Sequence, residues 1–436
     1  MTLEQSGEQS GEKSAAAPVL KLDGLALWLV ERGMQGLPLG EQIAGFCQRV
    51  FDSGFPMKRV SVGMYTLHPR YGSHTFVWRP GDDTVEHIPR ERAVVGHDIY
   101  LKSPVHYLRS RGLRTLRRRL DGGDTEEFIL FGELRAEGFV DYAAFLVPYD
   151  LGQAEAIGKA ADTVGAPTNP DRALDGIFFS CATDHPEGFD DGQLDQVAQM
   201  LPYLALSAKS RLTYDVASTV LETYLGRDAG RRVLTGQIER GSAEAIRAVI
   251  WFSDLRGFTK LTDSLPRDEL IATLDDYLEA MAGPVQNNGG QILKFMGDGL
   301  LATFDLTGRD EAAVCGEALR AAAELRRAFP VFNEVRRQEG KPIMDVGLAL
   351  HLGEVLYGNI GASERLDFTV VGPAVNEASR IQTLCRPLER SILISSTFKE
   401  AADEGNAAAD SGGLISLGFH ALRGVREPQE LFTLDG

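Results

Sequence analysis

The stretch AVIWFSDLRGFT, residues 248–259, decides the interpretation of this sequence. Its five leading residues are apolar and favour a buried β-strand, which ends in Ser253 and Asp254. An aspartate at the end of a buried strand is an unusual choice for packing alone. Gly257 follows three residues later and favours a sharp turn. The segment therefore predicts a strand that brings a carboxylate to a functional site.

A second carboxylate lies in ILKFMGDGLLATF, residues 292–304, between two strand-like runs. By itself Asp298 between two glycines indicates only a hairpin turn. Together with Asp254 it predicts two acidic residues at the ends of adjacent strands, which suits one or two divalent cations. Mg²⁺ binds one or two carboxylates together with substrate phosphates and waters. Two such ions about 3.5–4 Å apart activate an attacking oxygen and stabilise charge on a phosphoryl group.

A third motif, VVGPAVNEASRI at residues 370–381, is helical by pattern. Asn376 and Arg380 are four residues apart and therefore share one face of that helix. An amide and a guanidinium on one face suit the orientation of a sugar and the neutralisation of charge at phosphorus. On an isolated helix the same two residues would be ordinary surface residues.

These motifs resemble the catalytic domain of class III nucleotidyl cyclases over residues 245–436. The resemblance rests on four segments in register, FSDLRGFT, KFMGDG, HLGEVLYGNIG and VVGPAVNEASR. It implies a ferredoxin-like α+β fold, a mixed sheet flanked by helices. It also implies a homodimer in which two catalytic domains pair head to tail, with each active site drawn from both protomers.

The resemblance assigns a role to each matching residue. Asp254, Asp298 and the Leu255 carbonyl would hold two Mg²⁺ or Mn²⁺ ions. The turn at Gly257, Phe258 and Thr259 would offer backbone N–H groups to phosphate oxygens. The other protomer would supply Asn376 to orient the ribose and Arg380 to stabilise the transition state. Arg423 matches a position near the triphosphate. The implied reaction is attack of the ribose 3′-hydroxyl on the α-phosphorus, with release of pyrophosphate.

Two further positions bear on the choice of base. In the family a lysine paired with Asp or Thr recognises adenine, and a glutamate paired with Cys recognises guanine. This chain has Lys294 and Thr369, so the resemblance favours ATP as substrate and cyclic AMP as product. A guanylate or mixed-specificity cyclase and a non-catalytic scaffold on the cyclase fold are the alternatives.

The sequence departs from its relatives at two positions. Glu354 stands where some relatives carry an arginine for the β- and γ-phosphates, so that contact is absent or another group makes it. Pro373 stands where many relatives have Asp or Asn, and it favours the start of a helix.

The first half of the chain predicts a different organisation. We expect a disordered tail at 1–18, a GAF-like α/β sensor domain at 19–192 and a helical signalling linker at 193–244. Strands are expected in KRVSVGMYTL, SHTFVWR, DYAAFLVPY and DGIFFSCATD, a helix in GEQIAGFCQRVFDSG, and a solvated helix face in the basic run RSRGLRTLRRRL. A PAS-like relative or a structural platform is the alternative for this domain. Its role would be that of a ligand sensor, a protein-interaction module or a dimerisation platform, and the sequence names no ligand.

A long helix is predicted from Leu194 to Leu225, with Pro202 as a point where it could kink. Its apolar residues follow a heptad-like series of Leu194, Val197, Leu201, Leu204 and Ala208. One interpretation is a signalling helix that pairs across a dimer. The other is an amphipathic helix that packs on its own domain.

Composition limits the remaining possibilities. The 436 residues allow two or three domains, and a net charge of −17 with a pI near 5.0 argues against a nucleic-acid partner. Four widely spaced cysteines form no disulfide framework, which favours a reducing cytoplasm. No apolar run approaches the roughly 18 residues of a membrane span.

Overall fold

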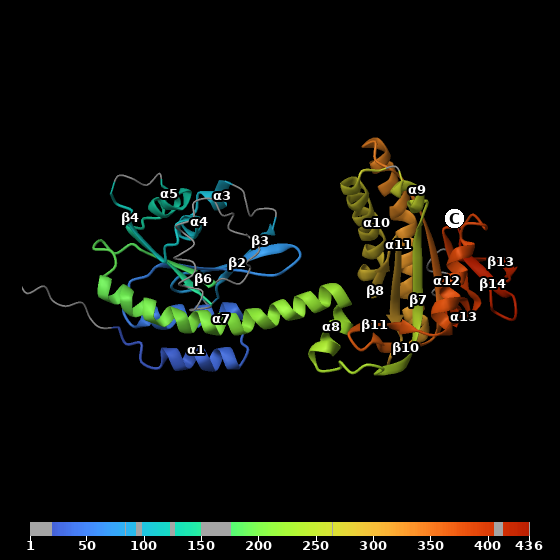
Figure 1. Ribbon diagram of the computed structural model, residues 1–436, viewed down its shortest axis with the longest axis horizontal. Coiled ribbons are helices and arrows are strands. Elements are labelled where there is room, and N and C mark those ends of the chain that lie inside the picture. Colours follow the sequence, from blue (N-terminus) through green and yellow to red (C-terminus); the bar gives the residue numbers. More distant parts are fainter. Residues whose placement is uncertain are drawn as a thin grey trace, which may run out of the picture. The chain divides into compact units, whose positions relative to one another are not determined.

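The computed structural model describes residues 20–82, 84–92, 98–122, 127–149, 176–263, 265–404 and 413–435. The chain divides into two compact units, Met1–Val220 and Leu221–Gly436 (Figure 1). The tail expected at 1–18 lies outside the described residues.

The N-terminal unit contains a six-stranded antiparallel sheet in the order β3-β2-β1-β6-β5-β4. Its strands are β1 (Arg59–Tyr65), β2 (Tyr71–Trp78), β3 (Glu86–Glu91), β4 (Thr115–Arg119), β5 (Asp141–Pro148) and β6 (Gly176–Thr183). The four strands expected from β-branched and aromatic residues are confirmed as β1, β2, β5 and β6.

Helices pack against this sheet to form two apolar cores. The described helices are α1 (Leu25–Met34), α2 (Leu39–Asp52), α3 (Asp98–Leu101), α4 (Pro104–Ser110), α5 (Ile129–Ala136) and α7 (Asp191–Leu225). Side chains of α1, α2 and α7 meet Val60, Val62 and Met64 of β1 in the larger core. A smaller core joins α4 and α5 to β4 and β5. The expected helix at 40–54 is confirmed as α2.

The basic run at 109–120 does not form the solvated helix face that was expected. α4 ends at Ser110, and residues Thr115–Arg119 form the edge strand β4. Arg117 on this strand forms an ion pair with Asp141, whose side chain is fully buried, at 2.8 Å and another with Asp191 at the first turn of α7. Part of the run therefore has a structural role, because a buried carboxylate needs a charged partner.

The long helix is confirmed as α7, which continues through Pro202. Its apolar series is buried in the core of the N-terminal unit, as is Leu212. These positions are therefore not available to pair with a second helix. Of the two interpretations, packing on its own domain accounts for the series.

The C-terminal unit contains an eight-stranded sheet in the order β13-β14-β12-β10-β7-β9-β8, with β11 paired to β10. Its strands are β7 (Ala243–Arg256), β8 (Gln291–Met296), β9 (Gly299–Asp305), β10 (Asp345–Ala362), β11 (Arg365–Val371), β12 (Ile392–Ser395), β13 (Leu414–His420) and β14 (Gln429–Leu434). β10 and β12 are parallel, which makes the sheet mixed as expected. β10 is a single long strand that contains the HLGEVLYGNIG motif.

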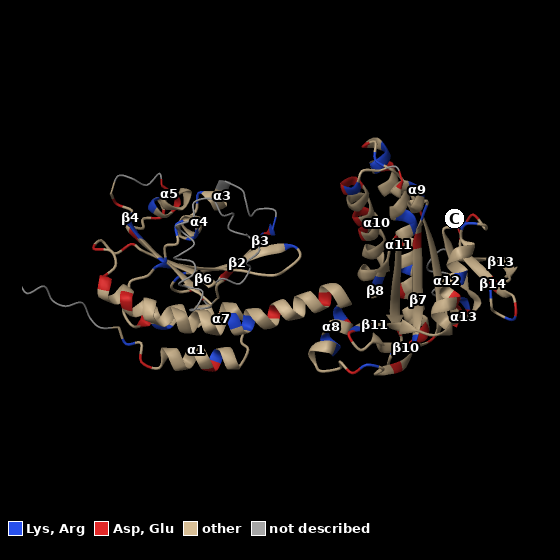
Figure 2. Ribbon diagram, viewed as in Figure 1, with Lys and Arg blue, Asp and Glu red and all other residues tan. Residues whose placement is uncertain are grey.

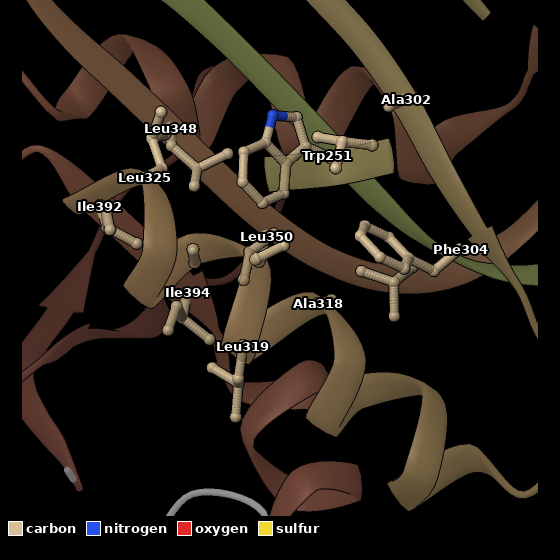
Figure 3. Close-up of a cluster of buried hydrophobic side chains, with 14 of the residues drawn as sticks. Trp251, Ala302, Phe304, Ala318, Leu319, Leu325, Leu348, Leu350, Ile392 and Ile394 are labelled. Carbon is tan, nitrogen blue, oxygen red and sulfur yellow. The ribbon is translucent and has the colours of Figure 1, made fainter. Parts of the chain in front are cut away.

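Helices cover both faces of this sheet. They are α8 (Arg227–Leu234), α9 (Phe258–Thr262), α10 (Arg267–Asn287), α11 (Glu311–Gln338), α12 (Pro373–Leu384) and α13 (Ser396–Glu404). On one face Trp251 and Phe304 of the sheet pack with Ala318 and Leu319 of α11 (Figure 3). On the other face α8 and α12 contribute Ala229, Ala374 and Ala378 to a second core. The unit is therefore an α+β fold with the central strands buried on both sides.

The structure also shows how the charged residues and the cysteines are distributed. Lys and Arg are interspersed with Asp and Glu among the described residues of both units (Figure 2). None of the described helices combines the length and the apolar character that crossing a bilayer requires. The four cysteines are free and buried.

Candidate active site

Asp254 and Asp298 meet at one end of the neighbouring strands β7 and β9. Asp254 pairs with Gly299 across β7 and β9, and Asp298 lies in the turn just before that glycine. The Leu255 N–H donates a hydrogen bond to the Asp298 carbonyl at 3.3 Å, which ties the two segments together. Both aspartates are half-buried. The strand pairing thus brings together the two carboxylates that the sequence singled out.

The electrostatic environment of these two carboxylates suits a bound cation. Burial, together with the nearby charge of Asp298, raises the pKa of Asp254 to about 6. A Cβ on Gly299 would lie 3.0 Å from the Asp254 Oδ1, so the glycine leaves space beside the carboxylate. In the part of the chain that the structure describes, no three His, Cys, Asp or Glu side chains form a metal cluster. The pair suits Mg²⁺ or Mn²⁺ that completes its coordination with water and phosphate oxygens.

The turn after Asp254 has the conformation that its glycine predicts. Gly257 has a φ of +92°, in the left-handed region that favours glycine. Phe258 begins the short helix α9 and packs against the main core, and Thr259 is exposed. The chain therefore reverses immediately beside the two carboxylates.

A second group of predicted residues lies around α12. Asn376 is exposed and Arg380 is half-buried on this helix, which Pro373 begins as expected. Arg380 and Arg423 line a groove of about 640 Å³ together with Thr383, Leu384 and Leu422. Neither guanidinium has a hydrogen-bond or ion-pair partner among the described residues. Two unpaired guanidinium groups in one groove suit a polyanionic ligand.

Lys294 on β8 and Thr369 on β11 form a third group of predicted residues. A bulge in the pairing of β8 with β9 separates Ile292 from Lys294, and the Lys294 Nζ lies 3.9 Å from the Asp367 Oδ2 on β11. Thr369 follows two residues later, so its side chain lies on the same face of β11 as that of Asp367. The Thr369 Oγ1 is buried and has no hydrogen-bond partner among the described residues.

Sequence reasoning missed Asp367 as a member of this region. The alternation of β11 could have identified it, because Asp367 and Thr369 are two residues apart on one strand. Glu354, which replaces an arginine of some relatives, is exposed on β10 opposite Arg247 of β7.

The two carboxylates and the N-terminal end of α12 are far apart within one chain. Asp254 pairs with Gly347 of β10, whereas Ala374 of α12 sits on Gly353, where a Cβ would lie 2.6 Å from the Ala374 Cβ. Gly347 and Gly353 are six positions apart, which is roughly 20 Å at about 3.3 Å per residue. Asp254 and the start of α12 in the same chain are thus well separated along the sheet.

Comparison with known proteins identifies this unit. Residues 242–434 match the family described as the adenylate and guanylate cyclase catalytic domain. An adenylate cyclase of Anabaena cylindrica is 38% identical over 162 residues, which cover 36% of this chain and 31% of that protein. An uncharacterized protein of Mycobacterium tuberculosis is 33% identical over 211 residues, which cover 47% of this chain and 36% of that protein. The chain spans about a third of the length of these curated relatives.

Solved structures are similar over less than half of the chain. The adenylyl cyclase CyaB of P. aeruginosa is 26% identical with a TM-score of 0.40, over 45% of this chain and 96% of that one. The guanylyl cyclase Cya2 is 29% identical with a TM-score of 0.37, over 44% of this chain and 92% of that one. Residues 242–434 are therefore similar to the adenylate and guanylate cyclase catalytic domain.

Proposed function

We propose that this protein is an adenylate cyclase that converts ATP to 3′,5′-cyclic AMP and pyrophosphate. The observation that carries the proposal is the pair of half-buried carboxylates at Asp254 and Asp298, with the pKa of Asp254 raised to about 6. Like charges held together at the end of a buried strand are costly unless a cation neutralises them. Such a pair is expected in an active cyclase and has no purpose in a scaffold that has lost catalysis.

The reaction forms one bond and breaks another at the α-phosphorus. The ribose 3′-hydroxyl attacks, the bond to the β-phosphate oxygen breaks, and pyrophosphate leaves while the hydroxyl proton passes to solvent. Two Mg²⁺ or Mn²⁺ ions, held by Asp254, Asp298 and the Leu255 carbonyl, would favour the alkoxide form of the hydroxyl and neutralise phosphate charge. We assign no side chain as general base.

The remaining residues bind and orient the nucleotide. Backbone N–H groups at Gly257, Phe258 and Thr259 donate hydrogen bonds to phosphate oxygens. Asn376 orients the ribose, and Arg380 stabilises charge that develops at phosphorus. Arg423 contacts the triphosphate, which its position beside Arg380 in one groove supports.

Adenine is the proposed base because of Lys294 and Thr369. The lysine donates to a ring nitrogen of adenine, and the threonine hydroxyl accepts from the exocyclic amine. Guanine presents an N–H and a carbonyl at these positions and would leave the lysine facing another donor. The buried Thr369 hydroxyl without a protein partner supports a role in ligand binding.

The working form is proposed to be a homodimer with head-to-tail catalytic domains. Ala374, at the start of the helix that carries Asn376, packs on β10 roughly 20 Å along the strand from the position opposite Asp254, which supports a site completed by a second chain. A second copy would bring its Asn376 and Arg380 to the first copy's carboxylates. Each dimer then has two composite sites.

The N-terminal unit is proposed as a GAF-like regulatory domain that acts in the cytoplasm. Its six-stranded antiparallel sheet supports this assignment, and α7 connects it directly to the catalytic unit. The four free cysteines agree with a reducing compartment. Removal of residues 1–225 should change specific activity substantially. Unchanged activity together with unchanged dimerisation would contradict the regulatory role.

The test of the proposed activity is identification of the product. Purified protein is incubated with ATP or GTP, under Mg²⁺ and separately under Mn²⁺, beside an Asp298→Asn variant. Cyclic AMP from the wild type alone is the expected result. Cyclic GMP as the main product would contradict the choice of adenine, and no cyclic nucleotide under any of these conditions would contradict the activity.

A further inference from the structure

Helix α12 sits close to the sheet through small residues. Ala374 lies against Gly353, and a Cβ on Gly347 would lie 2.9 Å from the Gln382 Nε2. Ala378 and Ile381 are buried on the same side of the helix. Small residues let the helix approach the strand, but they offer few contacts that would fix its rotation.

A polar contact lies at the flank of this packing. The Glu377 carboxylate is 3.6 Å from the His351 Nε2 on β10. The same Oε2 atom accepts a hydrogen bond from the Gln429 Nε2 on β14 at 3.1 Å. Glu377 thus joins α12 to two strands of the sheet, immediately after Asn376 and three residues before Arg380.

His351 is unusual among the polar residues of this unit. Its side chain is 5% exposed, and its Nδ1 is buried with no hydrogen-bond partner among the described residues. Burial lowers the pKa of His351, and the nearby Glu377 charge opposes that shift. Glu377 is the charged group whose field acts on the imidazole, and the residue paired with His351 on β7 is the apolar Ile250. A buried, incompletely satisfied histidine in contact with a carboxylate needs a reason beyond packing.

We propose that His351 and Glu377 are positioning residues that fix the rotation of α12 and thereby the placement of Asn376 and Arg380. The inference rests on the proposed function, because it concerns the same site. Glu377 is on the same rigid helix as both residues, so a rotation about the contact moves them together. A misplacement of about 1 Å costs on the order of 10²-fold in rate.

The contact is also sensitive to protonation. With a neutral imidazole the pair is a carboxylate beside a dipole, and with a protonated imidazole it becomes a buried ion pair. Protonation therefore changes the strength of the link between α12 and β10. Wild-type kcat should carry a titration step below the ordinary histidine value of 6.5.

The test compares the full-length His351→Gln and Glu377→Gln variants with Glu404→Gln. Glu404 is an exposed residue at the end of α13, far along the chain from α12, and serves as the matched control. We expect kcat for ATP to fall about tenfold or more in both variants, with KM within about twofold of wild type. The titration step in kcat should disappear, and the unfolding temperature should stay close to that of the control. Glu377→Asp should restore part of the activity.

A second readout needs no turnover. Amide hydrogen exchange of residues 373–384 should be about tenfold faster in His351→Gln and Glu377→Gln than in the control. Faster exchange in a protein that forms no cyclic nucleotide would support the positioning of α12 and contradict the proposed function alone. In an active enzyme, variants that match the control in kcat, pH profile and exchange would overturn the inference. A fall in kcat that accompanies a general loss of stability would overturn it as well, and would leave the cyclase activity established.

Discussion

Asp254 is the residue whose presence packing alone explains least. It ends a strand that is otherwise buried, and its carboxyl group is partly desolvated beside Asp298. Because its pKa is raised, the folded protein binds a proton at this site more readily than the unfolded chain does. Without a cation the ionised carboxylate is therefore destabilising, and this cost appears as pH rises through about 6.

Asp254→Asn should abolish cyclic nucleotide formation and stabilise the metal-free protein. In the presence of a chelator at pH 8, we expect a gain of about 1–2 kcal/mol after allowance for solvent screening, which is several degrees in unfolding temperature. Near pH 5 the gain should shrink, because the wild-type carboxyl is then largely protonated. Thermal unfolding at both values measures this. A variant that is less stable than wild type at pH 8 would contradict the account of the pair.

The residues proposed to recognise the base give a second prediction at this scale. Exchanging both Lys294→Glu and Thr369→Cys should invert the pattern of donors and acceptors. We expect the ratio of kcat/KM for GTP over ATP to rise by about 10²-fold or more. Thr369→Ser keeps the hydroxyl and should leave the ratio nearly unchanged. If the double variant prefers ATP as strongly as the wild type, these two residues do not select the base.

At the scale of elements, the sequence predicted most strands and helices that have a clear apolar pattern. The strand-like runs on either side of Asp298 are confirmed as β8 and β9, and the helical motif at 370–381 contains most of α12, because periodicity and turn residues agree there. Two strands of the N-terminal sheet, β3 (EHIPRE) and β4 (TLRRR), were missed. Both are edge strands rich in charged residues, which resemble loops or helix faces when only their own sequence is considered.

Only those residues of the candidate site that belong to a sequence motif could be predicted. Asp254 and Asp298 follow from strand ends and turn glycines, and pairing of β7 with β9 brings them together. Asp367, His351 and Glu377 were not predicted, because their contacts join segments that are distant in sequence. α7 shows the same limit, since its heptad-like series is satisfied by the core of its own unit.

Leu204→Ala tests that interpretation of α7. Leu204 is fully buried, so its truncation should cost about 2–5 kcal/mol of unfolding free energy in the N-terminal unit. Leu206→Ala, on the exposed side of the helix, should change stability by no more than about 0.5 kcal/mol. Urea unfolding of the full chain measures both. Equal small effects would mean that Leu204 does not pack in the core.

The hairpin of β2 and β3 carries a pH-sensitive contact. The His74 Nδ1 and the His87 Nε2 are 3.0 Å apart, and burial, with His87 and His68 nearby, lowers the pKa of His74 while Asp215 on α7 opposes this. Because the unfolded chain binds the proton more readily, stability of the N-terminal unit should fall as pH decreases below about 6.5. His87→Gln should reduce that dependence. Chemical unfolding at pH 8 and pH 5.5 tests this, and an equal dependence in the variant would contradict it.

At the scale of the whole molecule, the proposed active site needs two copies of the chain. The carboxylates lie at one end of β7 and β9, and the start of α12 packs roughly 20 Å away along β10. A substitution at either group should therefore inactivate a homodimer, since both of its sites lose the same part. Mixing two different inactive variants should restore one intact site in each mixed dimer.

The most direct measurement is cyclic AMP formation from ATP by a mixture of Asp298→Asn and Arg380→Ala proteins. Each variant alone is expected to be inactive. If subunits exchange freely, half of the dimers are mixed and each has one intact site, so activity should reach about a quarter of wild type. Restored activity would support catalysis at a composite site built by this chain. No activity in the mixture after verified subunit exchange, or full activity in either variant alone, would contradict it.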